Sequence, residues 1–404
     1  MLSSKRMFCR SSQHSYDRKK NAKVEIDYLA SCAIKDRCVD FYTDVKGTHV
    51  AERETFGHYL SDIHRFAKTL VAHSDPLFEF QSNFGIGNVV STRDGDALLS
   101  IFRSYSEIIL DEYVIHKFSP VATIFLEEAK NFNHTAVDNL NIPIDAKEAQ
   151  ALYDYLDQLV ARIRYLFSSK ETIKATSDFR RSATKNFNRC IESLAAVVDG
   201  AEFITILRFD IHYKSQERSG LPKTRKQILQ ELFEIRALRT AFHRKMRATL
   251  ASQIGGWMCC LEYGRYRGWH YHYLVVLKGA QKNSDRLIDN LGADWEVLTG
   301  IPDSYDNVNK RSHYRFNSTG ILSLGYAKSV VGLQFIAAYF TLGDCFVQLD
   351  LPSEDLTALN VTGIRSFIMG DFPEVMPRHR NKGKGPLPGL KIRVSHALKR
   401  VRFL

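Results

Sequence analysis

Two histidines separated by one residue, His270 and His272, lie in the segment GWHYHYLVVL. The aromatic and β-branched residues around them are typical of a strand, and residues two apart on a strand share a face. Two imidazoles on one face can bind a single divalent cation. With 14 histidines in 404 residues, this spacing also arises by chance, so neighbouring residues have to support the predicted metal site.

A second apolar run precedes this strand, and the turn-forming sequence GRYRG joins the two, which predicts a β-hairpin. A turn symmetric about Tyr266 places Glu262 opposite His270. Cys260 then lies opposite His272. Directly opposed residues point to the same face, so the Glu262 carboxylate joins both imidazoles. This ligand set leaves positions open for water or phosphate and suits catalytic Mg²⁺ or Mn²⁺.

A further predicted strand, over residues 203–211, carries Arg208 and Asp210 on one face, with His212 just beyond it. If this strand lies beside the hairpin, Asp210 becomes a candidate either for another metal ligand or for a group that orients a ligand. The residues alone leave both roles open.

In a basic protein, a bound divalent cation can polarise a phosphodiester. The nucleophile is then water or a side chain, and a tyrosine near a cation is a candidate because the cation favours its ionised form. Tyr339 and Tyr326 lie on or near the last predicted helix. The residues alone do not show which of these two tyrosines would be the nucleophile.

The elements that position these residues are four predicted strands and two predicted helices. In chain order they are the segments 203–211, 222–250, 256–263, 269–277, 333–342 and 345–351. The order strand, helix, strand, strand, helix, strand is that of the ferredoxin-like, or split βαβ, arrangement. We therefore predict an α+β fold built on an antiparallel sheet.

The chain divides into four predicted regions. Residues 1–24 are polar and basic, and we expect them to be disordered. Residues 25–197 show mostly helical periodicity and form a predicted helical accessory region. Residues 198–373 contain the candidate chemistry. Residues 374–404 form a basic tail.

The chain has 56 Lys and Arg against 45 Asp and Glu, a net charge of +11, and nine cations without any acidic residue follow Met376. Such a concentration favours a nucleic-acid partner, and single-stranded or origin DNA is the predicted one. The candidate DNA-binding cations are Arg208, Arg239, Arg244, Lys245, Arg265 and Arg267. No apolar stretch approaches the ~20 residues that span a bilayer, so no membrane partner is expected.

The seven cysteines are odd in number, and no C-x-x-C pair is present. This pattern predicts free thiols in a reducing, cytoplasmic compartment.

Three segments together resemble the motifs of the HUH endonuclease superfamily. They are the sequence RFD at 208–210, the run EYG-x-x-x-GWHYH at 262–272, and YFT at 339–341 followed by Asp344. More narrowly, these segments resemble the YagK/YfjJ-type replication proteins of filamentous phages (inoviruses) and prophages. The resemblance covers about residues 195–372, and the EYG-to-HYH run is its specific part.

The resemblance implies a rolling-circle replication initiator, which nicks one strand at an origin and stays bound to the 5′ end through tyrosine. His270 and His272 then correspond to metal ligands, Tyr339 to the nucleophile, and Glu262 to a third ligand. Host replication proteins are further candidate partners of such an enzyme.

The chain departs from the family at Leu342, where the family has a lysine one helical turn after the tyrosine. Lys328 is the candidate to replace it. The missing lysine also supports a second hypothesis, in which the chain has lost catalysis and acts as a DNA-binding protein in origin recognition or regulation.

Overall fold

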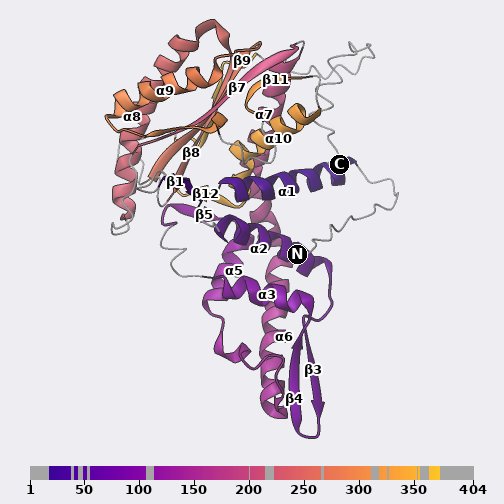
Figure 1. Cartoon of the computed structure of the whole chain (residues 1–404). Coiled ribbons are helices and arrows are strands. Elements are labelled where there is room, and N and C mark those ends of the chain that lie inside the picture. The colour runs from indigo at the N-terminus through magenta and orange to yellow at the C-terminus, as the bar shows by residue number, and fades with distance from the viewer. Residues whose placement is uncertain are drawn as a thin grey trace, which may run out of the picture.

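The computed structural model is α+β, with a central sheet covered by helices and a helical part extending away from it (Figure 1). The structure describes residues 18–37, 41–43, 49–51, 55–105, 113–199, 201–213, 223–264, 268–310, 318–324, 327–352, 354 and 364–373. The basic tail and residues 1–17 lie outside these ranges. Helix α1 (Arg18–Arg37) begins inside the segment that we predicted to be disordered.

The central sheet is built on three long strands, β7 (Phe203–His212), β8 (Ile254–Gly264) and β9 (Gly268–Lys278). Three short strands extend it, namely β10 (Tyr305–Asn307), β11 (Gly320–Ser323) and β13 (Phe367–Gly370). The order is β10-β7-β9-β8-β13, with β11 also paired to β7, and every pairing is antiparallel. The predicted hairpin is therefore confirmed as β8–β9.

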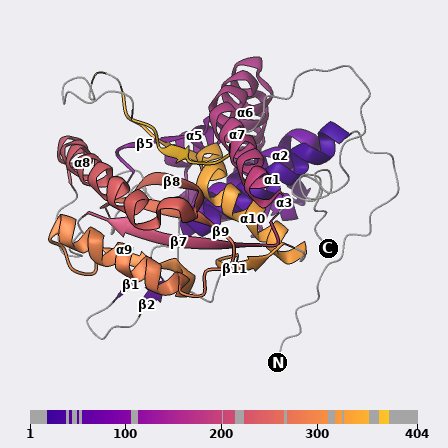
Figure 2. The same ribbon diagram turned by 90° about the horizontal axis from the view of Figure 1, so that it is seen from above.

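Each face of this sheet packs against its own helices, because side chains alternate along a strand. Odd-numbered residues such as Tyr273 pack with α8 (Arg225–Leu250) and α9 (Ser284–Thr299). Even-numbered residues such as Leu274 pack with α10 (Ala327–Thr341) and α1. Figures 1 and 2 both show α8 and α9 on the side of the sheet away from α1 and α10.

The prediction that 345–351 forms the fourth strand of the central sheet is wrong. After α10 the chain forms the 3₁₀ helix η4 (Leu342–Cys345), and β12 (Val347–Leu349) then pairs with β5 (His116–Phe118) in a separate two-stranded sheet. The edge beside β7 is instead filled by β10 and β11. These strands have three and four residues, too few to give a clear alternation of polar and apolar positions.

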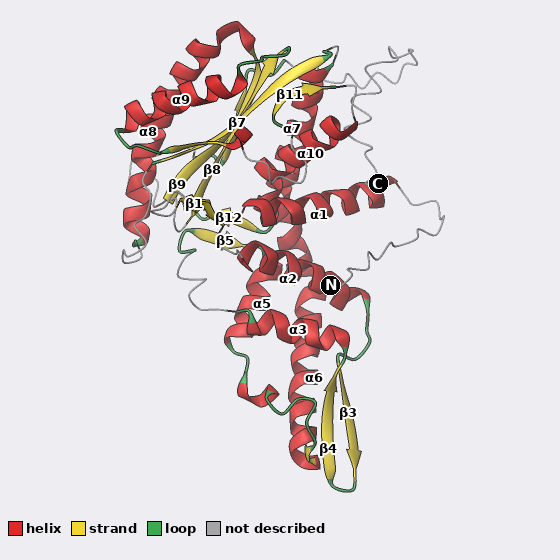
Figure 3. Cartoon of the chain, viewed as in Figure 1, coloured by secondary structure: helices red, strands yellow, loops and turns green. Residues whose placement is uncertain are grey.

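The N-terminal half is mostly helical, as predicted, and it also contains strands. Its helices are α2 (Thr55–Ala72), α3 (Arg93–Arg103), α5 (Pro120–Lys130), α6 (Ala146–Ser168) and α7 (Lys170–Val198). Its unpredicted strands, besides β5, are β1 (Phe41–Thr43), β2 (His49–Ala51), β3 (Phe78–Asn83), β4 (Ile86–Ser91) and β6 (Ile144–Asp145). Figure 3 shows β3 and β4 as a hairpin at the end remote from the central sheet.

Short 3₁₀ helices connect several of these elements. They are η1 (Thr135–Val137), η2 (Ala251–Gln253) and η3 (Val308–Lys310), in addition to η4. The two longest helices among those described, α7 and α8, begin at side-chain caps. Thr224 and Gln227 form a capping box at the start of α8, and Ser169 caps α7.

One hydrophobic cluster continues from the N-terminal helices to the even-numbered face of the sheet. It includes Leu29 of α1, Leu194 of α7, Cys260 of β8 and Leu333 of α10. The predicted accessory region therefore packs directly on the face that carries the predicted metal ligands.

Two smaller findings concern cysteines and membranes. The five cysteines in the part of the chain that is described are all free thiols. Among the helices that the structure describes, none has the length and apolar character needed to cross a lipid bilayer.

Candidate metal centre

The predicted ligands His270, His272 and Glu262, here called the metal triad, lie together on the β8–β9 hairpin. Their ligand atoms are all within 4.8 Å of one another. Glu262 Oε2 lies 3.2 Å from His272 Nε2 and 3.8 Å from His270 Nε2. The hairpin register is the predicted one, with Glu262 opposite His270 and Cys260 opposite His272. The cross-strand geometry therefore brings the three groups to one point.

Each imidazole is oriented by a hydrogen bond at Nδ1. His272 Nδ1 lies 2.6 Å from Asp210 Oδ1, and His270 Nδ1 lies 3.0 Å from the Gly268 carbonyl oxygen. When Nδ1 donates to these oxygens, Nε2 is left to bind a cation. Both Nε2 atoms face Glu262, so this donor set fits a divalent cation. Of the two roles open to Asp210, the geometry favours the orienting one.

The carboxylate of Glu262 is held in its charged form. Burial alone would raise its pKa, but Arg37 and the two imidazoles outweigh burial, and the pKa lies well below its usual range. Burial likewise would lower the pKa of His272, whereas Asp210 and Glu262 raise it above the usual value. Charged groups of opposite sign thus stabilise one another at the triad.

Tyr339 is the tyrosine that α10 brings to the triad. Its hydroxyl oxygen lies 3.3 Å from each ring nitrogen of His272, and the two rings meet edge to face. The guanidinium carbon of Arg208 lies 4.2 Å from the centre of the Tyr339 ring, within cation–π distance. Arg208, which we predicted as a DNA-binding cation, is buried beside this tyrosine.

Arg37, the last residue of α1, also reaches the triad, and our sequence analysis missed it. Its Nε donates to Glu262 Oε1 at 2.5 Å, and its Nη1 donates to Asp344 Oδ1 at 2.9 Å. Gly343 allows the approach, because a Cβ atom there would lie 2.2 Å from Arg37 Nη1. No local sequence signal marks an arginine whose partner lies 225 positions later in the chain.

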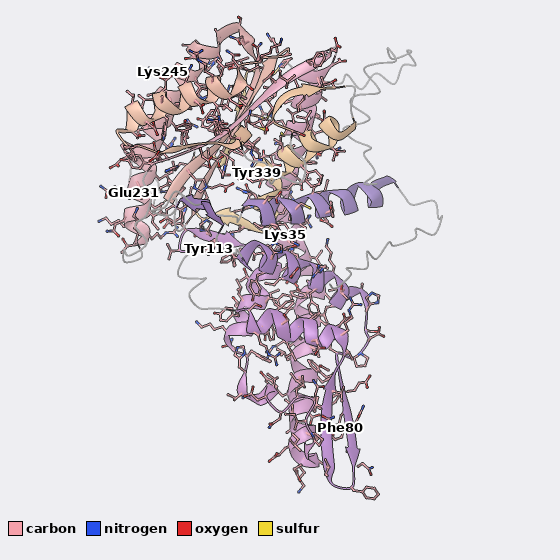
Figure 4. All side chains as sticks on the ribbon, viewed as in Figure 1. Lys35, Phe80, Tyr113, Glu231, Lys245 and Tyr339 are labelled. Carbon is pink, nitrogen blue, oxygen red and sulfur yellow. The ribbon has the colours of Figure 1, made fainter. Side chains whose placement is uncertain are left out.

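Three predicted DNA-binding cations lie on α8, across the sheet from the triad. Arg239 faces the odd-numbered side, with its guanidinium carbon 5.7 Å from the centre of the Tyr271 ring. Arg244 is exposed, and Lys245 is paired with Asp294 at 2.6 Å. Figure 4 shows Lys245 on the outer helical layer and Tyr339 on the opposite side of the sheet. The structure does not bring these three cations to the metal triad.

The remaining predicted site residues are not placed. Arg265, Arg267 and Tyr326 lie outside the described residues. Lys328 lies in the first turn of α10, but its side chain is outside the described part.

Comparison with known proteins assigns neither a family nor a function to this chain. No family model matches the chain, and no curated protein or solved structure matches it. The metal triad and Tyr339 are therefore the features from which a function can be inferred.

Proposed function

We propose that this protein is a metal-dependent endonuclease and transferase that cuts single-stranded DNA with Tyr339, and that it initiates rolling-circle replication of a phage, prophage or plasmid. The observation that carries the proposal is the Tyr339 hydroxyl, 3.3 Å from His272 of the metal triad. A nucleophile beside a ligand set with open positions is what transfer of a phosphodiester requires.

In the proposed reaction, His270, His272 and Glu262 hold the cation, and Asp210 keeps His272 in the tautomer that binds through Nε2. Bound Mg²⁺ or Mn²⁺ would withdraw charge from the phosphate oxygens. The Tyr339 phenol gives up its proton to solvent water and its oxygen attacks phosphorus. The bond from phosphorus to the 3′ oxygen breaks, and that oxygen takes up a proton from water. The new ester bond between Tyr339 and phosphorus replaces the broken one, so a 3′ hydroxyl can later attack phosphorus, displace the Tyr339 oxygen and rejoin the strand.

The strand order supports an HUH-like, ferredoxin-like sheet. Strands β7 and β8 are joined by α8, and the antiparallel β9 lies between them, as in a split βαβ unit. Helix α9 then leads to β10 on the other side of β7. In this assignment, α9 and β10 complete the unit, and α10 is the additional helix that presents Tyr339.

The position of Arg37 supports the proposed activity, although this chain has Leu342 where the family has a lysine. Leu342 is fully buried and cannot supply a cation. The Arg37 guanidinium contacts Glu262 of the triad and Asp344 of η4, close to the end of α10. In our proposal it provides the positive charge that the family obtains from lysine.

A covalent-adduct assay tests the proposal. The full chain is incubated with Mn²⁺ and a pool of end-labelled single-stranded oligonucleotides that includes candidate origin hairpins. We expect a DNA adduct that survives denaturing electrophoresis, requires the metal, and disappears in Tyr339→Phe. Tyr326→Phe is the matched control and keeps the adduct. An adduct that persists in Tyr339→Phe and disappears in Tyr326→Phe would show that the other tyrosine attacks.

The second candidate, a DNA-binding protein without catalysis, is favoured by the burial of the centre. Tyr339 is only 6% exposed and His272 only 3% exposed, so a DNA strand reaches them only after α1 or α10 moves. Tight binding of single-stranded DNA without any adduct, under conditions where Mn²⁺ binding is demonstrated, would support this candidate over the nuclease.

A further inference from the structure

A pocket of about 600 Å³ lies between α7 and β13, beside the metal centre. Its polar lining comes from α7, from η4 and from the residues around β12 and β13. These polar residues include Lys185, Asn186, Arg189, Asp344, Gln348 and Arg365. The pocket therefore joins the N-terminal half of the chain to the half that carries the metal triad.

The charges of this pocket favour an anion. Lys185 and Arg189 are one turn apart on α7, and Arg365 precedes β13. All three are exposed, and none forms an ion pair with another residue in the described ranges. The one acidic residue that lines the pocket, Asp344, is already paired with Arg37. A second pocket of about 540 Å³ near α2 and α3 lacks this excess, since Asp75, Glu79 and Asp94 line it.

The pocket also has an apolar wall, formed by residues such as Ile364, Phe367 and Met369. Cations beside an apolar wall fit the two parts of a nucleotide, because the phosphate pairs with the cations and the base packs on the wall. Asn186 adds an amide side chain to this lining, whereas the Gln348 amide nitrogen already donates to the carbonyl oxygens of Phe179 and Asp344.

We propose that this pocket binds one unpaired nucleotide of the DNA strand that enters the metal centre. The proposal rests on the proposed function and names the place where the single strand is held. Asp344 links the two sites, because its Oδ1 accepts from Arg37 Nη1 at 2.9 Å and Arg37 Nε donates to Glu262 at 2.5 Å. The pocket is therefore connected to the metal triad through Asp344 and Arg37.

Fluorescence anisotropy tests this proposal without any need for catalysis. The full chain is titrated with a fluorescein-labelled single-stranded oligonucleotide at several salt concentrations. The test variant is Lys185→Glu with Arg189→Glu. Its matched control is Lys170→Glu with Lys174→Glu, two exposed positions with the same spacing on the same helix and outside the pocket.

We expect the test variant to bind at least about tenfold more weakly than wild type at low salt. The slope of log affinity against log salt should become shallower by about 0.7, since the pocket neutralises one phosphate of a single strand. The control should keep the wild-type slope. Equal losses of DNA affinity in both variants would show that only the net charge of the protein matters, and would overturn the proposal.

The outcomes also separate this proposal from the proposed function. A wild-type protein that forms the Tyr339 adduct while the test variant binds DNA normally would refute the pocket and leave the nuclease in place. Selective loss of binding in the test variant, with no adduct from wild type, would establish the pocket and refute the nuclease. Absence of any DNA binding by the wild type would overturn both.

Discussion

At the scale of single residues, Arg37 determines the charge of the metal centre. Its guanidinium pairs with the buried carboxylates of both Glu262 and Asp344. Asp344 already has a pKa above its usual value, because burial outweighs the attraction of Arg37. A buried carboxylate that loses its cation is strongly destabilising. Arg37 thus stabilises the fold at the point where the proposed chemistry takes place.

The first prediction concerns Arg37→Ala. Removing one partner of a buried ion pair costs about 3–5 kcal/mol, and we expect the free energy of unfolding in urea to fall by that amount. The control Arg65→Ala removes an exposed partner of Asp62 and should cost at most about 1 kcal/mol. Gly343→Ala provides a further check, since its Cβ atom would displace the guanidinium. In the Arg37→Ala background, Gly343→Ala should be nearly neutral.

The second prediction concerns Asp210→Asn. The amide keeps the size of the side chain but no longer orients and polarises His272 through a charged hydrogen bond. Loss of such an outer partner weakens metal binding roughly 10- to 100-fold. Calorimetric titration of the apo protein with Mn²⁺ measures this directly. Unchanged affinity in Asp210→Asn, together with lost affinity in His270→Ala, would show that Asp210 has no part in metal binding.

Pairing within the centre could be predicted from strand geometry where its residues are close in sequence, whereas Asp210 and Tyr339 were named only as candidates. The hairpin turn fixes the pairing of Glu262 with His270, so strand geometry alone predicts the triad. Arg37 could not be found this way, because its contact with Glu262 depends on how a distant helix packs. Burial of the site could not be predicted from the sequence either, because it results from the packing of α1 and α10 on the sheet.

At the scale of elements, α1 is held in place by a half-buried carboxylate, that of Asp27. Asp27 pairs with Lys68 of α2 at 2.6 Å and also with Arg180 of α7. Burial alone would raise the pKa of Asp27, but the two cations outweigh it and the pKa is lowered. Asp27 therefore connects three helices and fixes the helix that carries Arg37.

The third prediction follows from this pKa. Because the folded-state pKa of Asp27 lies below its ordinary value of 3.8, its contribution to stability is present above that value and is lost as pH falls through the folded-state pKa. Asp27→Asn should lower the unfolding free energy at neutral pH, and its curve should approach that of wild type in acid. Urea unfolding at a series of pH values measures both curves. The control Asp62→Asn removes an exposed ion pair and should change the unfolding free energy by at most about 1 kcal/mol.

The elements differ in how well the sequence predicts them. Long, strongly patterned segments were predicted correctly, such as α8, which was predicted over 222–250 and spans Arg225–Leu250. The short strands β10 and β11 were not, because they have three and four residues and are defined by their partners. The strand β12 was predicted within 345–351. The assignment of β12 to the central sheet was wrong because η4 leads the chain to β5 instead.

At the scale of the whole molecule, the two halves share one hydrophobic cluster. Residues of α1 and α7 pack with residues of β8, β9 and α10. A fragment that begins after α7 would expose the apolar, even-numbered side of the sheet, so the boundary near residue 198 marks a change in secondary structure within one continuous core. We therefore expect the two halves to unfold together.

The last prediction tests this cooperativity with two probes. All three tryptophans, Trp257, Trp269 and Trp295, lie in β8, β9 and α9, so their fluorescence reports on the second half. Far-UV circular dichroism is dominated by helices, many of which lie in the first half. The two signals should give coincident urea transitions, which is a test of two-state unfolding. Arg37→Ala should shift both transitions equally, because α1 belongs to the shared core. If the dichroism transition moved while the tryptophan transition stayed in place, the halves would be independent domains, and the ion pair between Arg37 and Glu262 would not hold them together.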